Sequence, residues 1–228
     1  MISTPIIDHE LLREGIKQNN IRIIDVRRED DYKAGHIKNS VNLPLAKLLN
    51  DDSVENIAKI AGELGISDNT PVVVYDDTFG ALSSRVVWAL QYIGHNDVKL
   101  LSVTFSQWKE LGLDITTKVP EIEKSTHSIK IQSDIMATAD YLEKVKDKKN
   151  VVIIDNRERL NFLEQHIPGA INIPYRTLAT DGQIIRTKES MRSLLKNRGI
   201  PEDAEIITYC GSVGTLSGLA YYALKSIG

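Results

Sequence analysis

A domain-sized internal repeat constrains the fold of this 228-residue chain more than any other feature. Three segments recur 130 positions later, as residue 23 does at 153, and segments farther along recur 134 positions later, as residue 65 does at 199. The matched segments are residues 23–27 with 153–157, 36–37 with 166–167, 42–44 with 172–174, 65–66 with 199–200, 72–75 with 206–209, and 80–83 with 214–217. A period of this length is too long for a solenoid unit. We therefore expect two tandem domains of one fold.

Strands and helices are expected to alternate along both copies. Short β-branched runs predict buried strands at residues 21–25, 41–44, 72–75, 96–101, 151–155, 170–173 and 205–209. Apolar residues at helical spacing, with plausible caps at Asp8, Gly65 and Ser133 or Asp134, predict helices at residues 8–17, 29–34, 54–64, 83–93, 105–111, 133–144, 189–197 and 215–227. Unbroken apolar strands alternating with helices indicate the α/β class, with a mainly parallel sheet flanked by helices in each domain.

The boundary between the copies is predicted from composition. Polar residues around Pro120 favour a linker at residues 119–128, between a first domain at 1–118 and a second at 129–228. The second copy ends at Gly228, the counterpart of Gly94, so we expect the second domain to lack the last strand and helix of the first. Either the chain is a truncated product or something else covers that part of the core, and the open sheet edge would permit self-association.

Composition excludes several classes of partner. The chain is 42% hydrophobic and 26% charged with a net charge of −3, which gives no reason to expect nucleic acid or an anionic membrane. No apolar run has bilayer-spanning length, and residues 1–5 do not read as a secretory signal. The five histidines are scattered, so neither a metal site nor a cofactor is expected. One cysteine cannot form an internal disulfide, which fits a reducing, cytoplasmic location.

That single cysteine, Cys210, lies between a predicted strand and a predicted helix. The loop leaves backbone N–H groups unpaired at the helix start, where the helix dipole also favours an anion, so a thiolate there would have a lowered pKa. The alternative is a buried structural cysteine. Ligand sites of parallel α/β sheets lie beyond the carboxyl ends of the strands, which is where Cys210 falls. The first copy has Asp76 at this position and is therefore expected to be catalytically silent.

Taken together, these motifs resemble the rhodanese family of sulfurtransferases, in its tandem form with an inactive first domain and an active second one. The most specific parts are the Asp-x-Arg…His-Ile-Pro-Gly-Ala-x-Asn-x-Pro signature at residues 155–174 and the loop at residues 210–215. The resemblance implies that Cys210 takes a sulfane sulfur from a small-molecule donor, holds it as a persulfide, and passes it to a thiophilic acceptor such as cyanide or a thiol. The residues that it implies for substrate binding are Arg157, Gly211, Ser212, Val213, Gly214 and Thr215.

Several alternatives remain open at this point. In the family, loop cations go with thiosulfate, whereas Cys-Gly-Ser-Gly-Val-Thr goes with 3-mercaptopyruvate; residues 210–215 read Cys-Gly-Ser-Val-Gly-Thr, which favours the second donor although Gly and Val are exchanged. Related phosphatases use Cys-x5-Arg, but here that position is Leu216, so phosphoryl transfer is set aside. Arg157 could instead form a structural ion pair. His36 and His166 match in both copies, which favours a structural role. A non-catalytic rhodanese-like binding module is the competing function.

Overall fold

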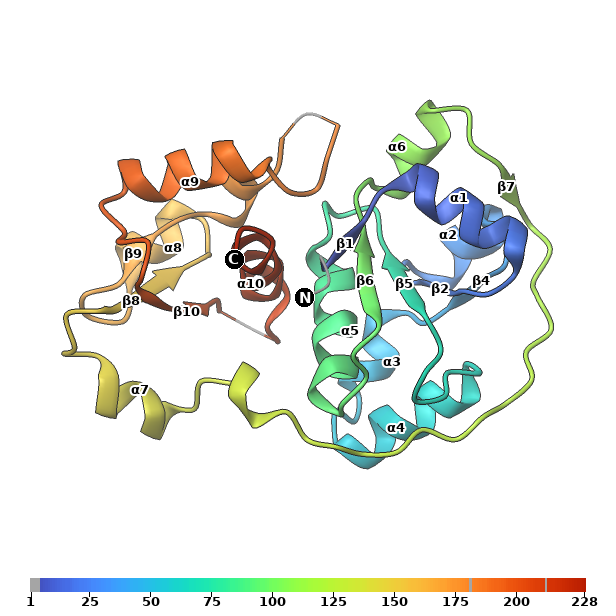
Figure 1. The fold of residues 1–228 in the computed structure, drawn as a ribbon, viewed down its shortest axis with the longest axis horizontal. Helices are drawn as coiled ribbons and strands as arrows, with labels where there is room; N and C mark the ends of the chain where they lie inside the picture. Colours follow the sequence, from blue (N-terminus) through green and yellow to red (C-terminus); the bar gives the residue numbers. More distant parts are fainter. Residues whose placement is uncertain (1–4, 181, 212) are drawn as a thin grey trace. The chain divides into compact units, whose positions relative to one another are not determined.

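The computed structural model describes residues 5–180, 182–211 and 213–228, and the chain divides into two compact units, Met1–Ser133 and Asp134–Gly228 (Figure 1). Each unit contains a parallel sheet flanked by helices, which confirms the predicted α/β fold class.

The first unit is built on a five-stranded sheet in the order β1-β6-β5-β2-β4, in which every neighbouring pair is parallel. A two-stranded antiparallel pair, β3 with β7, lies outside it. The elements are β1 (Ile6–Ile7), α1 (His9–Gln18), β2 (Arg22–Asp25), α2 (Glu29–Ala34), β3 (His36–Ile37), β4 (Ser40–Asn42), α3 (Leu45–Leu49), α4 (Val54–Glu63), β5 (Val72–Tyr75), α5 (Ala81–Tyr92), β6 (Val98–Leu101), α6 (Phe105–Glu110) and β7 (Ile115–Thr116).

Helices cover both faces of this sheet, so its central strands are buried on both sides. All four residues of β5 are buried, and alternate side chains point to opposite faces. Val73 and Tyr75 pack with Leu12 of α1 and Trp108 of α6 on one face, whereas α3, α4 and α5 cover the other (Figure 1). The predicted cap of α1 is confirmed, since the Asp8 carboxylate accepts a hydrogen bond from Glu10 N at 2.9 Å.

The second unit has a three-stranded parallel sheet in the order β10-β8-β9, which matches β5-β2-β4 of the first unit. Counterparts of β1, β6, α6 and β7 are not found among its described residues. Its elements are the 3-10 helix η1 (Ser133–Ile135, which begins at the unit boundary), α7 (Ala139–Val145), β8 (Val151–Asp155), α8 (Arg159–Glu164), β9 (Ile171–Asn172), the 3-10 helix η2 (Tyr175–Leu178), α9 (Lys188–Asn197), β10 (Glu205–Tyr209) and α10 (Thr215–Lys225).

The structure differs from the sequence-based expectations at the join between the copies. The expected linker at residues 119–128 lies within the first unit, where Ser125 N donates to Gly62 O at 2.9 Å and the buried His127 contacts His95. The helix predicted over residues 133–144 is also interrupted. Only a 3-10 turn forms at its start, and α7 is capped by Thr138, whose hydroxyl accepts from Tyr141 N.

Candidate active site

The loop between β5 and α5 of the first unit is an anion-binding cradle that already contains an anion. The buried carboxylate of Asp76 accepts hydrogen bonds from the backbone N–H groups of Thr78, Gly80, Leu82 and Ser83 at 2.8–2.9 Å, and from the Ser83 hydroxyl at 3.2 Å. These donors lie at the start of α5, where helix N–H groups have no partner within the helix. The left-handed Gly80 (φ +84°) turns the chain so that they converge.

The loop between β10 and α10 is the counterpart of this cradle, with Cys210 at the position of Asp76. Gly214 precedes the helix with φ +76°, close to the value at Gly80. Cys210 is half-buried, and its Sγ accepts a hydrogen bond from the Ser217 hydroxyl at 3.5 Å, as Asp76 does from Ser83. Two features of the first cradle thus recur around the sulfur.

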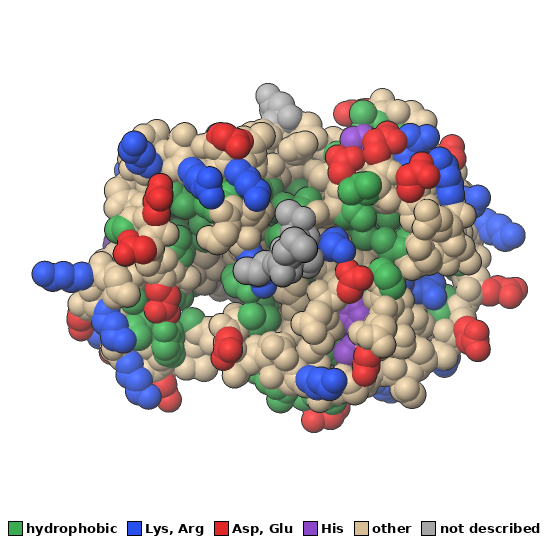
Figure 2. All heavy atoms as spheres, in the orientation of Figure 1, with side chains coloured by type: hydrophobic (Ala, Val, Ile, Leu, Met, Phe, Trp, Pro, Cys, Tyr) green, Lys and Arg blue, Asp and Glu red, His purple; other side chains and the backbone are tan. Residues whose placement is uncertain are grey.

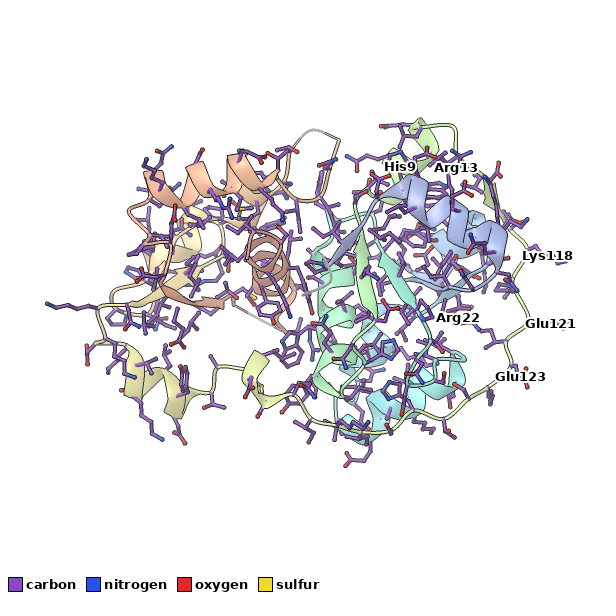
Figure 3. The ribbon with its side chains drawn as sticks, viewed as in Figure 1. His9, Arg13, Arg22, Lys118, Glu121 and Glu123 are labelled. Atoms are coloured by element: carbon purple, nitrogen blue, oxygen red, sulfur yellow. The ribbon has the colours of Figure 1, made fainter. Side chains whose placement is uncertain are left out.

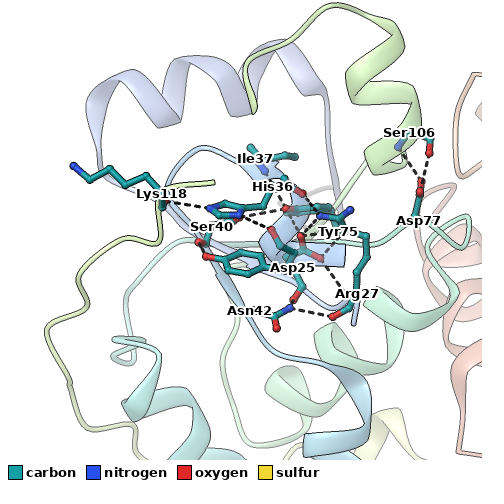
Figure 4. Close-up of polar contacts among 12 residues, drawn as sticks. Asp25, Arg27, His36, Ile37, Ser40, Asn42, Tyr75, Asp77, Ser106 and Lys118 are labelled. Carbon is teal, nitrogen blue, oxygen red and sulfur yellow. Dashed lines mark hydrogen bonds and ion pairs between the residues drawn. The ribbon is translucent and has the colours of Figure 1, made fainter. Parts of the chain in front are cut away.

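A three-residue clamp holds the strand ends beside each cradle. In the first unit, Arg27 Nε and Nη2 donate to the fully buried Asp25 carboxylate at 2.6–3.1 Å, and Nη2 also donates to Gly35 O at 2.7 Å (Figure 4). The Tyr75 hydroxyl donates to Asp25 at 2.5 Å and accepts from Ile37 N at 3.1 Å. Burial, followed by the Asp25 charge, raises the pKa of Tyr75 well above its ordinary value, so this hydroxyl stays protonated.

The second unit repeats the clamp. Arg157 Nε and Nη2 donate to Asp155 at 2.7–3.1 Å, Nη2 reaches Gln165 O at 2.5 Å, and the Tyr209 hydroxyl accepts from Ile167 N at 3.1 Å. Burial alone would raise the pKa of Asp155, but hydrogen bonds from Arg157 and Tyr209 lower it overall. Arg157 therefore does make the structural ion pair that its position allowed as an alternative.

Arg157 nevertheless differs from Arg27 in what covers it. In the first unit the Phe105 ring lies 3.6 Å from the Arg27 guanidinium carbon, and only 9% of the Arg27 side chain is exposed. Among the described residues the ring recorded over Arg157 is that of Tyr209, whose centroid is 5.7 Å from the guanidinium carbon, and 21% of the Arg157 side chain is exposed. A Cβ placed on Gly211 would lie 3.2 Å from Arg157 Cδ, so this arginine passes directly beside the residue that follows Cys210.

The other predicted loop residues have different environments. Gly211 and Val213 are exposed, Val213 to 47%, Gly214 is half-buried, and Thr215 is buried in the first turn of α10. Ser212 lies outside the described residues. Sequence reasoning did not single out Tyr209 or the paired amides Asn42 and Asn172, although their recurrence in both copies was a signal that could have identified them.

Each amide closes the end of a strand. Asn42 Nδ2 donates to the carbonyls of Asp25 and Arg27, both at 3.0 Å, and Asn172 Nδ2 does the same with Asp155 and Arg157 at 3.1 and 3.0 Å. The clamp arginine is therefore fixed through its backbone as well as through its carboxylate partner.

Each matched histidine packs on its preceding helix. His36 Nδ1 lies 2.8 Å from Tyr32 O, and the two rings stack at 3.8 Å; His166 Nδ1 lies 2.7 Å from Phe162 O, with rings stacked at 3.9 Å. The repetition of both contacts agrees with the structural role expected from the sequence.

The described residues contain no group of three or more His, Cys, Asp or Glu side chains arranged to hold a metal ion, and no helix among them has the length and apolarity needed to cross a membrane. On the face drawn in Figure 2, acidic and basic side chains are interspersed rather than separated by sign.

Fold and site together define a class: a duplicated parallel α/β protein in which an anion-binding cradle follows β5 and the matching loop after β10 holds a cysteine. A family model described as a rhodanese-like domain matches residues 8–111 and 138–228. The chain belongs to the rhodanese family.

Curated relatives and a solved structure agree with this assignment. The chain is 26% identical to a sulfur carrier protein, TtuD, of Thermus thermophilus, over 96% of this chain and 86% of that protein. It is 32% identical to a probable 3-mercaptopyruvate sulfurtransferase of Schizosaccharomyces pombe, over 76% of this chain and 64% of that protein. The crystal structure of SseA from Escherichia coli, a 3-mercaptopyruvate sulfotransferase by its description, superposes with a TM-score of 0.87 at 24% identity, covering 99% and 95% of the two chains. The relatives mark the chain as an enzyme of the sulfurtransferase class.

Proposed function

We propose that this chain transfers a sulfane sulfur from a small-molecule donor to a thiophilic acceptor through a persulfide on Cys210. The observation that carries the proposal is the first unit's cradle, in which four backbone N–H groups and one hydroxyl hold the Asp76 carboxylate. The second copy keeps Gly214, Leu216 and Ser217 at the matching positions and has a thiol in place of the carboxylate. A loop built to hold an anion favours the thiolate over the thiol.

The chemistry consists of two nucleophilic displacements at sulfur. With thiosulfate, the Cys210 thiolate attacks the outer sulfur, the donor S–S bond breaks, and sulfite leaves with the bonding electrons. With 3-mercaptopyruvate, the C–S bond breaks instead, and the pyruvate enolate leaves and takes up a proton. In the second half-reaction the acceptor attacks the terminal persulfide sulfur, the persulfide bond breaks, and the thiolate returns. The loop amides would stabilise the negative terminal sulfur in between.

Arg157 is proposed to hold the anionic group of the donor. Its side chain lies against Gly211, is 21% exposed, and presents Nη1, for which no partner is found among the described residues. The Asp155 carboxylate fixes the guanidinium, which leaves one N–H edge for a carboxylate or sulfonate. Within this proposal, the backbone amides of residues 211–215, Ser212 included, supply the rest of the donor site.

The donor is proposed to be 3-mercaptopyruvate in preference to thiosulfate. No lysine or arginine lies between Gly211 and Ala220, so the thiosulfate dianion would meet a single cation, Arg157. A carboxylate with a neutral thiol-bearing chain needs only one. The first domain, with Asp76 in place of a cysteine, is proposed to be catalytically silent. The free cysteine would require a reducing compartment such as the cytoplasm, and neither nucleic acid nor a membrane is proposed as a partner.

Mass spectrometry of the intact protein after incubation with each donor tests the proposal. We expect a gain of one sulfur atom on Cys210, faster with 3-mercaptopyruvate, and its loss as thiocyanate when cyanide is added. Cys210→Ser is the matched control and should gain no sulfur. A wild-type chain that gains no sulfur from either donor, or a Cys210→Ser variant that turns over normally, would favour the non-catalytic binding module instead.

A further inference from the structure

A pocket in the first unit lies away from the Asp76 cradle of the same unit. It has a volume of about 520 Å³ and opens beside Arg22, at the start of β2, and Thr70 and Pro71, just before β5. The Asp76 loop follows the opposite, carboxyl end of β5, so this pocket and that loop are separated by the length of the sheet. Asn19, Asn39 and Glu121 also line the pocket.

Arg22 is the only basic residue in this lining, and its charge is uncompensated. Its Nε is buried and makes no hydrogen bond, and no ion pair to Arg22 is found within the described part of the chain. Burial lowers the pKa of the guanidinium, and no neighbouring carboxylate contributes to that shift. A partly desolvated guanidinium without a partner costs stability, so its presence requires a reason.

The fold itself does not require an arginine at this position. The repeat places Val152 at the same point of β8, at the same half-buried depth. The surroundings have also diverged, because Thr70 and Asn39 are matched by Ala204 and Gly169 in the second copy. The polar pocket is therefore a property of the first unit alone, and a shared structural need does not explain it.

Backbone geometry keeps space for the Arg22 side chain. A Cβ on Gly65 (φ +70°) would lie 2.8 Å from Arg22 Nη2 and 2.7 Å from Glu123 O. A side chain there would displace the guanidinium or the segment that carries Glu123. Its repeat counterpart, Gly199, also has φ +70° but meets nothing within 4 Å. Figure 3 shows the segment that carries Lys118, Glu121 and Glu123 passing along the same side of the first unit as Arg22.

We propose that this pocket binds a small molecule through one oxyanionic group, a carboxylate or a phosphate, held by Arg22. A guanidinium binds either group through paired N–H donors, and Arg22 lines the pocket while its Nε–H has no acceptor among the described residues. Asn19, Asn39 and Thr70 offer neutral polar groups for the rest of the ligand, with Asn39 Nδ2 already linked to Asn19 at 3.3 Å. The carboxylate of Glu121 in the lining disfavours a second negative charge. The pocket volume falls in the usual range for small-molecule sites.

The test follows the side-chain ¹H–¹⁵N signal of Arg22 Nε in the full chain while sodium acetate or inorganic phosphate is added, with sodium chloride to match ionic strength. We expect a saturable shift of this signal with one or both oxyanions and none with chloride. Acetate alone identifies a carboxylate site, phosphate alone a phosphate site, and both a general oxyanion site. A shift that is linear, absent or equal in chloride overturns the proposal.

Two variants assign the effect. Arg22→Gln removes the charge and should weaken binding roughly tenfold or more, as followed by heat of binding. Arg13→Gln is the matched control, because Arg13 lies on the surface of α1 in an ion pair with Glu10 and should leave binding unchanged. Equal affinity in wild type and Arg22→Gln contradicts the assignment. The wild-type titration stands even if Arg22→Gln fails to fold, and it is independent of Cys210 chemistry.

Discussion

The two copies of this chain place different chemical groups in one backbone arrangement. After β5, the cradle is filled by Asp76, a buried side chain that accepts five hydrogen bonds and needs nothing from outside. After β10, the same cradle has a half-buried thiol at its centre. The neighbouring arginines diverge in the same sense, since Phe105 covers Arg27 whereas Arg157 remains partly open.

The difference shows which interactions belong to the fold and which are available for chemistry. Both copies keep the Asp–Arg–Tyr clamp with nearly the same distances, so the clamp is required to join strand ends and loop. The residue in the cradle and the covering ring differ between the copies. The filled Asp76 cradle satisfies its own donors, whereas under the proposed function the loop around Cys210 keeps its preference for negative charge available for a reaction.

The sharpest test of this comparison moves the thiol to the first unit. In Asp76→Cys combined with Cys210→Ser, sulfur transfer should stay at least about a thousandfold below wild type. Asp76 is 2% exposed, and Phe105 N donates to its backbone carbonyl at 2.9 Å, so α6 closes the approach of a donor. Thiocyanate formation measures the activity. Restored turnover would show that the residue in the cradle alone separates the two units.

The next largest effect concerns stability. Asp76→Ala leaves five donors without an acceptor and should lower the free energy of unfolding of the first unit by about 3 kcal/mol. Both tryptophans, Trp88 and Trp108, lie in this unit, so fluorescence during urea unfolding reports on it.

The neighbouring Asp77 provides the control. It is exposed, and within the described part of the chain its side chain is bonded only to Ser106, so Asp77→Ala should cost less than about 1 kcal/mol. Equal losses for the two variants would contradict the idea that the Asp76 carboxylate is what stabilises this cradle.

A smaller effect is expected from the paired arginines. Arg157→Gln should lower kcat/KM for an anionic donor about thirtyfold, the loss of a charged hydrogen bond worth about 2 kcal/mol. Arg27→Gln removes the equivalent ion pair from Asp25 and should reduce the stability of the first unit without changing turnover. Steady-state kinetics on both variants measures kcat/KM. A similar loss of kcat/KM in both would mean that Arg157 acts only by stabilising the fold.

The smallest expected difference is in pH dependence. Burial, reinforced by the neighbouring His127, lowers the pKa of His95, while Thr70 O and Asp97 oppose the shift. The stability that comes from keeping His95 neutral is therefore present above the unfolded pKa of about 6.5 and is lost as pH falls toward the lower folded value.

The second unit has no buried histidine among its described residues, and its His166 is exposed. Urea unfolding between pH 7 and 5, followed by tryptophan fluorescence, should show the first unit weakening. His95→Asn should flatten this dependence, and an unchanged slope in that variant would assign the effect to another group.

Local sequence pattern predicted the elements that depend on local signals. The strands at residues 72–75, 151–155 and 205–209 and the helix at 29–34 have the expected bounds, because continuous β-branched runs and clear flanking residues specify them. The two-residue strands β3 and β7 were not predicted, since pairing between His36–Ile37 and Ile115–Thr116 joins segments almost 80 residues apart without any periodic signal.

The candidate site was predictable in part for the same reason. The repeat related Cys210 to Asp76 and Arg157 to Arg27, but it could not show that Asp76 accepts five hydrogen bonds or that Phe105 lies over one arginine. Those facts depend on contacts between distant segments. The segment expected to be a linker, residues 119–128, packs on the first unit through the contact of His127 with His95. The polar composition around Pro120 does not reveal this contact.

The Asp76 carboxylate has a practical consequence for inhibitor design against the second cradle. Its two oxygens lie 2.8–2.9 Å from the backbone amides, and they mark where this loop best accommodates a negatively charged atom. A covalent reagent that leaves a carboxylate on Cys210 would imitate the Asp76 carboxylate of the first unit. Iodoacetate should therefore label the protein faster than neutral iodoacetamide, the reverse of their usual order with simple thiols.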